Sequence, residues 1–201
     1  MKRLTLTLAA AALLAASALP AIASDTLTVP TVASAPSGTS GFSGAVASVD
    51  WNATDRRRAD EPATVNAVSD GKYLYVRFDV PQREPMIGGS GGDYVAIDLW
   101  PNGQDGDVYH YGVDIGGTRT SDSTPNTAGW DATASAHPGG YTVTMRIPAS
   151  AAQGNGTSQV QFSRWIASTG ELQTWAHGAG GTDVAQAGTL VIASSVGAAQ
   201  P

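Results

Sequence analysis

Aspartates are the first residues in this sequence that could do chemistry. Asp93 and Asp98 bound one apolar-rich segment, and Asp114 and Asp122 follow further along the chain. Calcium takes about six to eight oxygen ligands, and carboxylates at the rim of a sheet could supply several of them. The spacing differs from the Asp-x-Asp-x-Asp-Gly pattern of a calcium-binding hand loop. The four carboxylates are therefore candidate calcium ligands, and calcium is the cofactor that we predict.

Few residues in the sequence would support catalysis. There are three glutamates, Glu61, Glu84 and Glu171, and no signature marks two of them as a glycosidase pair. The three histidines lack the H-E-x-x-H or other paired spacing of a zinc site. The sequence contains neither a G-x-S-x-G nucleophile elbow nor a cysteine. We therefore expect the protein not to be an enzyme.

Large aromatic side chains are the candidates for ligand contact. Such side chains are buried on average, which favours a core position for most of the five tryptophans. Trp100 and Trp175 could serve equally well as core residues or as ligand platforms. The three that we interpret as core residues are Trp51, Trp130 and Trp165.

An antiparallel β-scaffold is predicted to position these residues. The segments Tyr73–Val80, Asp93–Trp100 and Tyr141–Ile147 alternate apolar and polar residues, which is typical of half-buried strands. Asp70-Gly71 precedes the first of them, as in a tight hairpin. About nine short strands, with at most one helical turn at 149–152, predict an all-β, antiparallel β-sandwich or jelly roll with almost no helix. The predicted core residues are Leu74, Val76, Phe78, Val95, Ile97, Val143, Met145 and Ile147.

The domain organisation is that of a secreted bacterial protein. Residues 1–23 begin with two basic residues, continue with an apolar run and end in Ala-x-Ala, which predicts a signal peptide cleaved near Ala23/Ser24. The run is shorter than the roughly 20 residues that span a bilayer, so no membrane span is expected. Secretion without cysteines suits a bacterial periplasm or medium. We expect a flexible lead-in at 24–40, one β-domain at 41–193 and a disordered tail at 194–201.

The charge of the chain restricts its partners. The formal net charge of −6 includes Lys2 and Arg3, so cleavage of the signal peptide changes it to −8. An acidic surface disfavours nucleic acid and anionic membranes, and it is compatible with neutral ligands and bound cations. The oligomeric state does not follow from the sequence.

Five motifs occur in a characteristic order between Phe42 and Ala193. They are Lys72–Val76; Asp93–Asp98; Tyr109–Val113 followed by Gly116-Gly117; Gly140–Pro148; and Phe162–Arg164 followed by Trp175 and Gly188–Ile192. In order and spacing they resemble carbohydrate-binding module family 9 and the wider DOMON-like superfamily. The resemblance covers nearly all of the chain after the expected signal peptide.

The resemblance implies a β-sandwich that binds sugar ends on aromatic platforms, often with calcium, in proteins linked to carbohydrate catabolism. A sugar ring packs its apolar C–H face on an indole, while polar groups nearby bind its hydroxyls. Trp175 stands where the family has a stacking tryptophan, so we expect it to bind carbohydrate and to be partly exposed. The family's second tryptophan is replaced by Ser90-Gly91-Gly92. Trp100, on the same side of its expected strand as Tyr94 and Asp98, is the candidate substitute, and Tyr94 is the third candidate carbohydrate-binding residue.

Two other functions remain open at this point. Some relatives of the family are structural domains of outer-membrane proteins, so the chain could be a structural or assembly domain without a sugar slot. A related sandwich superfamily binds haem b through methionine and histidine, and Met86 and His177 are the residues that would serve here.

Overall fold

The computed structural model describes residues 25–82, 91–103, 106–121, 128–152, 157–176 and 186–193. Strands make up well over a third of these residues, as predicted, and the helical elements are one turn each. The elements in chain order are β1 (Thr26–Val29), η1 (Thr39–Phe42), β2 (Ala45–Asn52), β3 (Arg57–Ser69), β4 (Tyr73–Pro81), β5 (Tyr94–Trp100), β6 (Tyr109–Asp114), β7 (Arg119–Ser121), β8 (Asp131–His137), β9 (Gly140–Pro148), α1 (Ala149–Ala152), β10 (Thr157–Ile166), β11 (Glu171–Thr174) and β12 (Gly188–Ile192).

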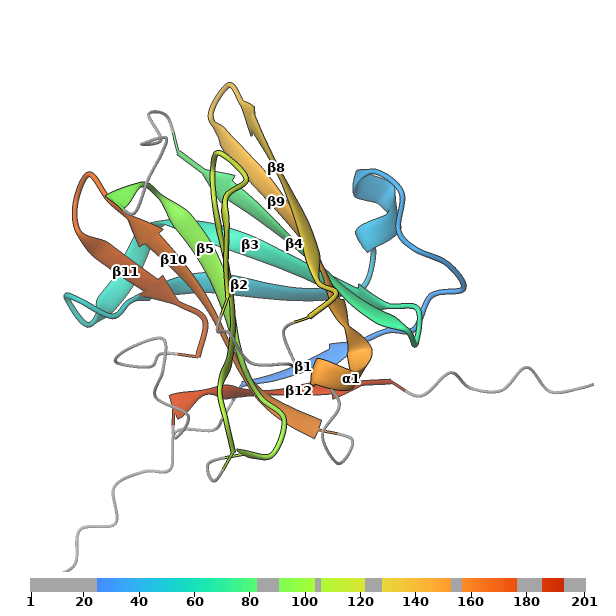
Figure 1. Cartoon of the computed structure of the whole chain (residues 1–201). Coiled ribbons are helices and arrows are strands. Elements are labelled where there is room, and N and C mark those ends of the chain that lie inside the picture. Colours follow the sequence, from blue (N-terminus) through green and yellow to red (C-terminus); the bar gives the residue numbers. More distant parts are fainter. Residues whose placement is uncertain are drawn as a thin grey trace, which may run out of the picture.

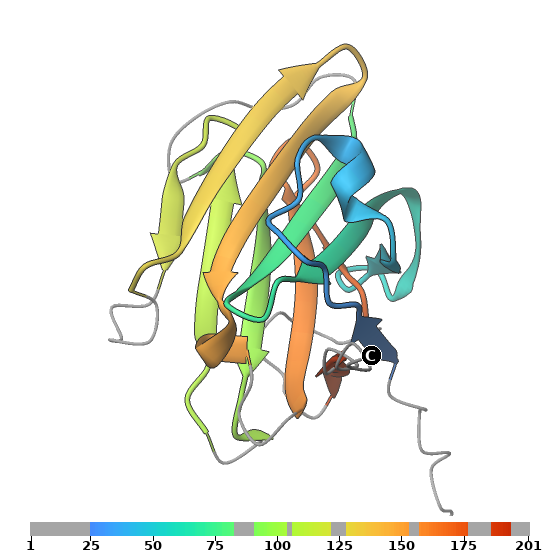
Figure 2. The same ribbon diagram turned by 90° about the vertical axis from the view of Figure 1, so that its right-hand side faces the viewer.

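The strands form a β-sandwich, which confirms the predicted fold class (Figures 1 and 2). Hydrogen bonds connect them in the order β7-β6-β5-β10-β11-β2-β3-β4-β9-β8, and β12 pairs with both β10 and β1. β11 joins the two layers, because its residues pair with β10 on one side and with β2 on the other. The ring of Phe78 on β4 meets that of Phe162 on β10 edge-on at 6.1 Å, so side chains of both layers share one core.

The β3–β4 hairpin shows how local sequence sets the register. Gly71 has φ 83°, a conformation that favours glycine. Oδ1 of Asp70 accepts hydrogen bonds from the backbone N–H groups of Lys72 (2.9 Å) and Tyr73 (2.7 Å), which closes the turn. The hairpin therefore begins its return strand at Tyr73, and the apolar residues of β4 point inward.

All eight predicted core residues are buried. Within the core, β4 and β9 pair so that Phe78 lies opposite Val143 and Val76 opposite Met145. The one-turn helix α1 is also at the predicted residues. The alternation of apolar and polar residues was sufficient to assign the buried face, because each of these strands has one face toward the core and one toward solvent.

The N-terminal lead-in is not loose where the structure describes it. β1 pairs in parallel with β12, from Thr26 opposite Thr189 to Val29 opposite Ile192 (Figure 1). Leu27 and Val29 are buried in the core. The segment 24–40 therefore contains a strand, β1, whose apolar residues complete the sandwich. The expected signal peptide and C-terminal tail lie outside the described residues.

Within the described ranges, no helix has the length and apolar character needed to cross a membrane.

Candidate functional site

The outer face of β5 and β10 combines aromatic, small and polar side chains. Val95, Ile97 and Leu99 belong to the core, so the alternate residues of β5 face outward. β10 lies antiparallel beside β5, and its outward residues are in register with them. The cross-strand pairs that we call the outer face are Tyr94–Trp165, Ala96–Ser163 and Asp98–Gln161.

Tyr94 and Trp165 form the aromatic end of the outer face. Both side chains are half-buried, and as direct cross-strand partners they are neighbours on the sheet. Burial raises the pKa of the Tyr94 hydroxyl, and the negative charge of Asp98 raises it further. The Tyr94 hydroxyl is therefore within electrostatic reach of the Asp98 carboxylate.

Asp98, His110 and Gln161 form a polar row across β6, β5 and β10. Asp98 is opposite His110 on one side and opposite Gln161 on the other. Nδ1 of His110 donates to Oδ1 of Asp98 at 2.8 Å. Oε1 of Gln161 accepts from the backbone N–H groups of Trp175 (3.1 Å) and Ala176 (3.0 Å).

The amide nitrogen of Gln161 lacks a hydrogen-bond partner. Gln161 is 0% exposed, and its Nε2 is one of three buried side-chain atoms without a partner in the described part of the chain. An unsatisfied buried donor costs about 1–3 kcal/mol, so such a group is commonly explained by water or a ligand that completes it. Gln161 is the cross-strand partner of Asp98, so an amide and a carboxylate occupy neighbouring positions on the outer face.

The structure changes the roles expected of the two tryptophans. Trp175 is 7% exposed, packs against Phe162 with ring centroids 5.4 Å apart and lies directly over Gly188. The expectation that Trp175 is partly exposed is therefore wrong, because its ring fills the core. Trp100 shares the outward side of β5 with Tyr94 and Asp98, as predicted, but it is only 4% exposed.

The other three tryptophans, interpreted from the sequence as core residues or plugs between the sheets, are less buried than Trp100 and Trp175. Trp51, Trp130 and Trp165 are all half-buried rather than buried. Trp130 is partly packed against the core and meets the Tyr111 ring edge-on at 5.3 Å. Trp165 matters most for a binding site, because it lies beside Tyr94 on the neighbouring strand.

The candidate calcium ligands do not come together in the described structure. Asp93 is fully buried, and its oxygens accept from Gln82 Nε2 and Ala167 N, both at 2.7 Å. Asp98 accepts from His110, and Asp114 accepts from Thr118 N in the β6–β7 turn. Asp122 lies outside the described residues, within which no group of three or more acidic, histidine or cysteine side chains could hold a metal ion. Calcium binding remains a prediction without a described site.

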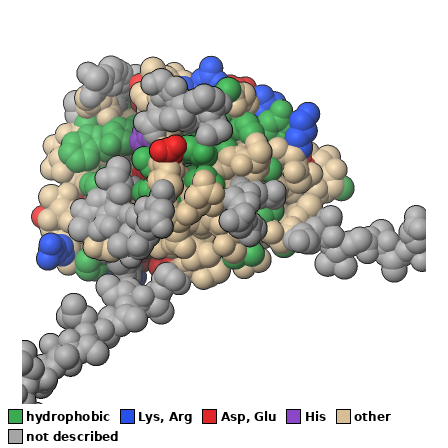
Figure 3. Space-filling model, turned by 60° about the horizontal axis from the view of Figure 1, so that its bottom comes forward, with side chains coloured by type: hydrophobic (Ala, Val, Ile, Leu, Met, Phe, Trp, Pro, Cys, Tyr) green, Lys and Arg blue, Asp and Glu red, His purple; other side chains and the backbone are tan. Residues whose placement is uncertain are grey.

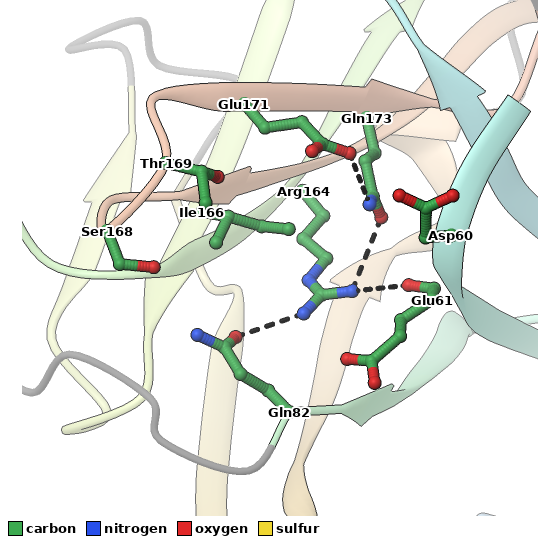
Figure 4. A pocket seen from close by; sticks show the side chains of 9 residues that line it. All are labelled: Asp60, Glu61, Gln82, Arg164, Ile166, Ser168, Thr169, Glu171 and Gln173. Atoms are coloured by element: carbon green, nitrogen blue, oxygen red, sulfur yellow. Dashed lines mark hydrogen bonds between the residues drawn. The ribbon is translucent and has the colours of Figure 1, made fainter. Parts of the chain in front are cut away.

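A separate cavity of about 410 Å³ opens at one end of the sandwich (Figure 4). It lies between β3, the end of β4 and the β10–β11 hairpin. Arg164 lies at its centre, with carboxylates and amides around it. Its nine lining residues are Asp60, Glu61, Gln82, Arg164, Ile166, Ser168, Thr169, Glu171 and Gln173.

Arg164 connects the two layers across this cavity. NH1 donates to the backbone oxygen of Glu61 (2.7 Å) and to Gln173 Oε1 (3.3 Å). NH2 donates to the backbone oxygen of Pro81 and to Gln82 Oε1, both at 3.0 Å. Burial lowers the pKa of Arg164, while the charges of Asp93, Glu61 and Glu171 act to raise it. The residue is therefore a buried cation held by protein acceptors.

Sequence reasoning missed three residues of these two sites. Trp165 was assigned to the core, and Gln161 was not singled out. The buried residues Val160 and Phe162 of the same strand indicate which positions of β10 face inward. Arg164 was read only as part of a family motif. Met86 and His177, the candidate haem ligands, lie outside the described residues.

The fold is that of carbohydrate-binding module family 9. A module of this family from Caldicellulosiruptor kristjanssonii, in complex with glucose, matches with a TM-score of 0.68 and 18% identity, over 88% of this chain and 100% of the other. Its complex with cellotriose matches with a TM-score of 0.65 and 18% identity, over 88% and 98% of the two chains. A proposed carbohydrate-binding protein from Bacteroides uniformis matches with a TM-score of 0.58 and 16% identity, over 85% and 100%.

No family model matches the sequence. No curated protein matches it either. At these identities the solved structures establish the fold, and they leave the ligand of this chain to be argued from its own residues.

Proposed function

We propose that the chain is a non-catalytic carbohydrate-binding domain and that the outer face of β5 and β10 holds the sugar. The observation that carries the proposal is the register of two cross-strand pairs, Tyr94–Trp165 and Asp98–Gln161. The aromatic pair offers flat apolar surface for the C–H face of a sugar ring. The polar pair offers a carboxylate that accepts and an amide that donates, which is what a pair of hydroxyls needs.

The spacing of the two pairs suits a sugar. Tyr94 and Asp98 are four residues apart along β5, a rise of about 13 Å, so the aromatic and polar pairs lie at the two ends of the outer face. The residues between them, Ala96 and Ser163, are small and would form the floor. Tyr94 and His110 are partly exposed, so a ligand would approach from their side and reach Gln161 at the deeper end.

The comparisons support the same function. The two family 9 structures hold glucose and cellotriose in a fold that this chain shares over most of its length. We include secretion in the proposal because of the signal sequence at residues 1–23. The charge of the chain fits a neutral ligand, and on the face shown in Figure 3 acidic and basic side chains are scattered among polar ones.

A glycan array followed by calorimetry tests the proposal. The array identifies a bound sugar for the chain from Ser24 onward, and calorimetry then measures its affinity for three variants. Trp165→Ala and Tyr94→Ala should each weaken binding at least tenfold, which corresponds to about 1.4 kcal/mol. Tyr73→Ala is the matched control, since this half-buried tyrosine lies on β4 in the other layer. An array without a binder, or unchanged affinity in both outer-face variants, would contradict the proposal.

A further inference from the structure

The strand β8 is an open edge of the sandwich. It is the last strand in the pairing order, and among the described residues it pairs with β9 alone (Figures 1 and 2). Five of its seven residues are exposed, and the residues between its two ends are all small. The strand at the other end of the order, β7, has only three residues. Long edges are usually protected by lysine, proline or a bulge, and β8 has none of these, so it is open to a further strand.

Alternate residues of β8 direct their backbone N–H and C=O groups to the open side. The β8–β9 turn has two residues, so the pair that flanks it, His137 and Gly140, is a hydrogen-bonded pair. Every second residue of β8 counted back from His137 is bonded to β9 in the same way. The residues between them point their backbone groups away from β9, and these are Ala132, Ala134 and Ala136.

Arg119 of β7 marks where the open stretch begins. Its NH1 donates to the backbone oxygen of Trp130 at 3.1 Å, and Trp130 is an even-numbered position like the three alanines. The backbone oxygen just before β8 is therefore already used. The open stretch runs from Asp131 to His137, with Arg119 at one end and the turn at the other.

The open stretch is complementary to a second copy of itself. An antiparallel pair centred on Ala134 places like residues opposite one another: Asp131 opposite His137, Ala132 opposite Ala136, Thr133 opposite Ser135, and Ala134 opposite Ala134. The free backbone groups of the three alanines then face each other, and about six hydrogen bonds would form. At each end an imidazole N–H meets a carboxylate. Oδ1 of Asp131 accepts from Arg119 at 2.9 Å, and its Oδ2 has no hydrogen-bond donor among the described residues.

We propose that β8 is a dimerisation edge, at which two copies of this chain pair antiparallel about Ala134 and join their sheets into one. The contact is isologous, because each copy contributes the same seven residues. Ala132 and Ala134 pack toward the core, so small methyl groups of both copies meet on the inner face, while Thr133 and Ser135 meet on the outer face. The partner strand ends at His137, before it reaches the position that Arg119 occupies. The sugar face lies on β5 and β10, so the two proposals are independent.

Sedimentation of the chain from Ser24 onward, over a series of concentrations, measures the dimer. A single pair of strands buries little surface, so we expect a weak dimer that forms between about 1 µM and 1 mM. Ala134→Pro removes a backbone N–H on the open side and leaves the bonds to β9 in place, so it should weaken the dimer at least tenfold. Circular dichroism checks that the variant is folded. A monomer at every concentration, or a dimer that a folded Ala134→Pro protein forms as tightly as wild type, would overturn the proposal.

A cysteine pair tests the register, and it decides the question if the proline variant does not fold. The chain has no cysteine of its own, and Thr133 and Ser135 are both exposed. Thr133→Cys and Ser135→Cys proteins, mixed and mildly oxidised, should form a disulfide between copies, because directly opposite residues lie within disulfide reach. A mixture of Ser135→Cys with Val46→Cys is the control, since Val46 is 60% exposed on β2. The first mixture should cross-link at least tenfold faster, and equal rates would overturn the proposal.

Discussion

Arg164 and Trp165 are neighbours in the chain, yet one closes the interior of the sandwich and the other faces away from it. Arg164 is almost completely buried and bonded to both layers, whereas Trp165 is half-exposed beside Tyr94. A charged residue thus takes the inner position of β10 and the largest apolar residue takes the outer one. Both candidate sites of this protein depend on that inversion, and it generates the first of the predictions below.

Replacing Arg164 should destabilise the fold strongly. Arg164→Met leaves the Glu61 and Pro81 carbonyls and two buried amides without their donor, and each buried polar group left unpaired costs about 1–3 kcal/mol. Urea unfolding measures the change. Arg58→Met is the control, because Arg58 is 77% exposed in its pair with Asp50 and should cost under about 1 kcal/mol. Equal effects of the two substitutions would contradict the structural role of Arg164.

Truncation of Phe78 should also be costly. Its ring is fully buried against Phe162, so Phe78→Ala is expected to lower the free energy of unfolding by about 3–5 kcal/mol. Chemical denaturation provides the measurement. A loss below about 1 kcal/mol would mean that β4 presents its other face to the core.

Trp175 should behave as a core residue. Trp175→Ala is expected to cost about 3–5 kcal/mol of stability, since its ring packs on Phe162. Gly188→Ala tests the same contact from the other side, because an added Cβ would lie 2.4 Å from the Trp175 ring. Overpacking of this kind costs about 1–3 kcal/mol. A Trp175→Ala protein that melts like wild type but no longer binds sugar would restore the platform role expected from the family resemblance.

The hydrogen bond from the Tyr75 hydroxyl to Asp70 Oδ2 (2.8 Å) should make the β3–β4 hairpin sensitive to pH at both extremes. Burial and this bond raise the pKa of Tyr75 from 10.0 to about 12, so its contribution is complete below pH 10 and is lost as pH rises toward 12. Burial acts to raise the pKa of Asp70, but hydrogen bonds from Tyr73, Tyr75 and Lys72 outweigh it and lower that pKa. The contribution of Asp70 is therefore present above its unfolded value near 3.8 and is lost as pH falls below it.

Tyr75→Phe isolates this effect. The substitution should cost about 1 kcal/mol at neutral pH, and the difference from wild type should shrink above pH 10, as urea unfolding at several pH values would show. Tyr73→Phe, on the same strand with its ring 6.1 Å from that of Tyr75, is the control. A Tyr75→Phe difference that stays constant up to pH 12 would contradict the assignment.

The alternating strands could be predicted from the sequence because each has a single dry face. Leu74, Val76 and Phe78 follow the two-residue period without exception, and the Asp70-Gly71 turn fixes their register. For β10 the residue types alone predict the wrong faces, whereas the two-residue alternation of the strand predicts the right ones. A tryptophan is expected inside and an arginine outside, but Val160 and Phe162 place the even positions inward. Counting from Phe162 would have assigned both Arg164 and Trp165 correctly.

The two sites could not be predicted because their contacts are long-range. Arg164 NH1 and the Glu61 carbonyl are 103 residues apart in sequence, and no local pattern encodes that bond. The pairing of Tyr94 with Trp165 likewise requires that β5 and β10 be neighbours, which only the strand order shows. The family resemblance identified the fold and the strand that carries Tyr94, and it pointed to Trp175, whose ring the structure buries.

The parallel pairing of β1 with β12 has a mechanical consequence. The chain enters β1 at Thr26 and leaves β12 at Ile192, and these two points lie at opposite ends of the paired strands. A force that pulls the two ends apart would therefore act along the strands and load all of their hydrogen bonds at once. Separation in this shear geometry requires the bonds to break together, whereas a force across the strands would open them one by one.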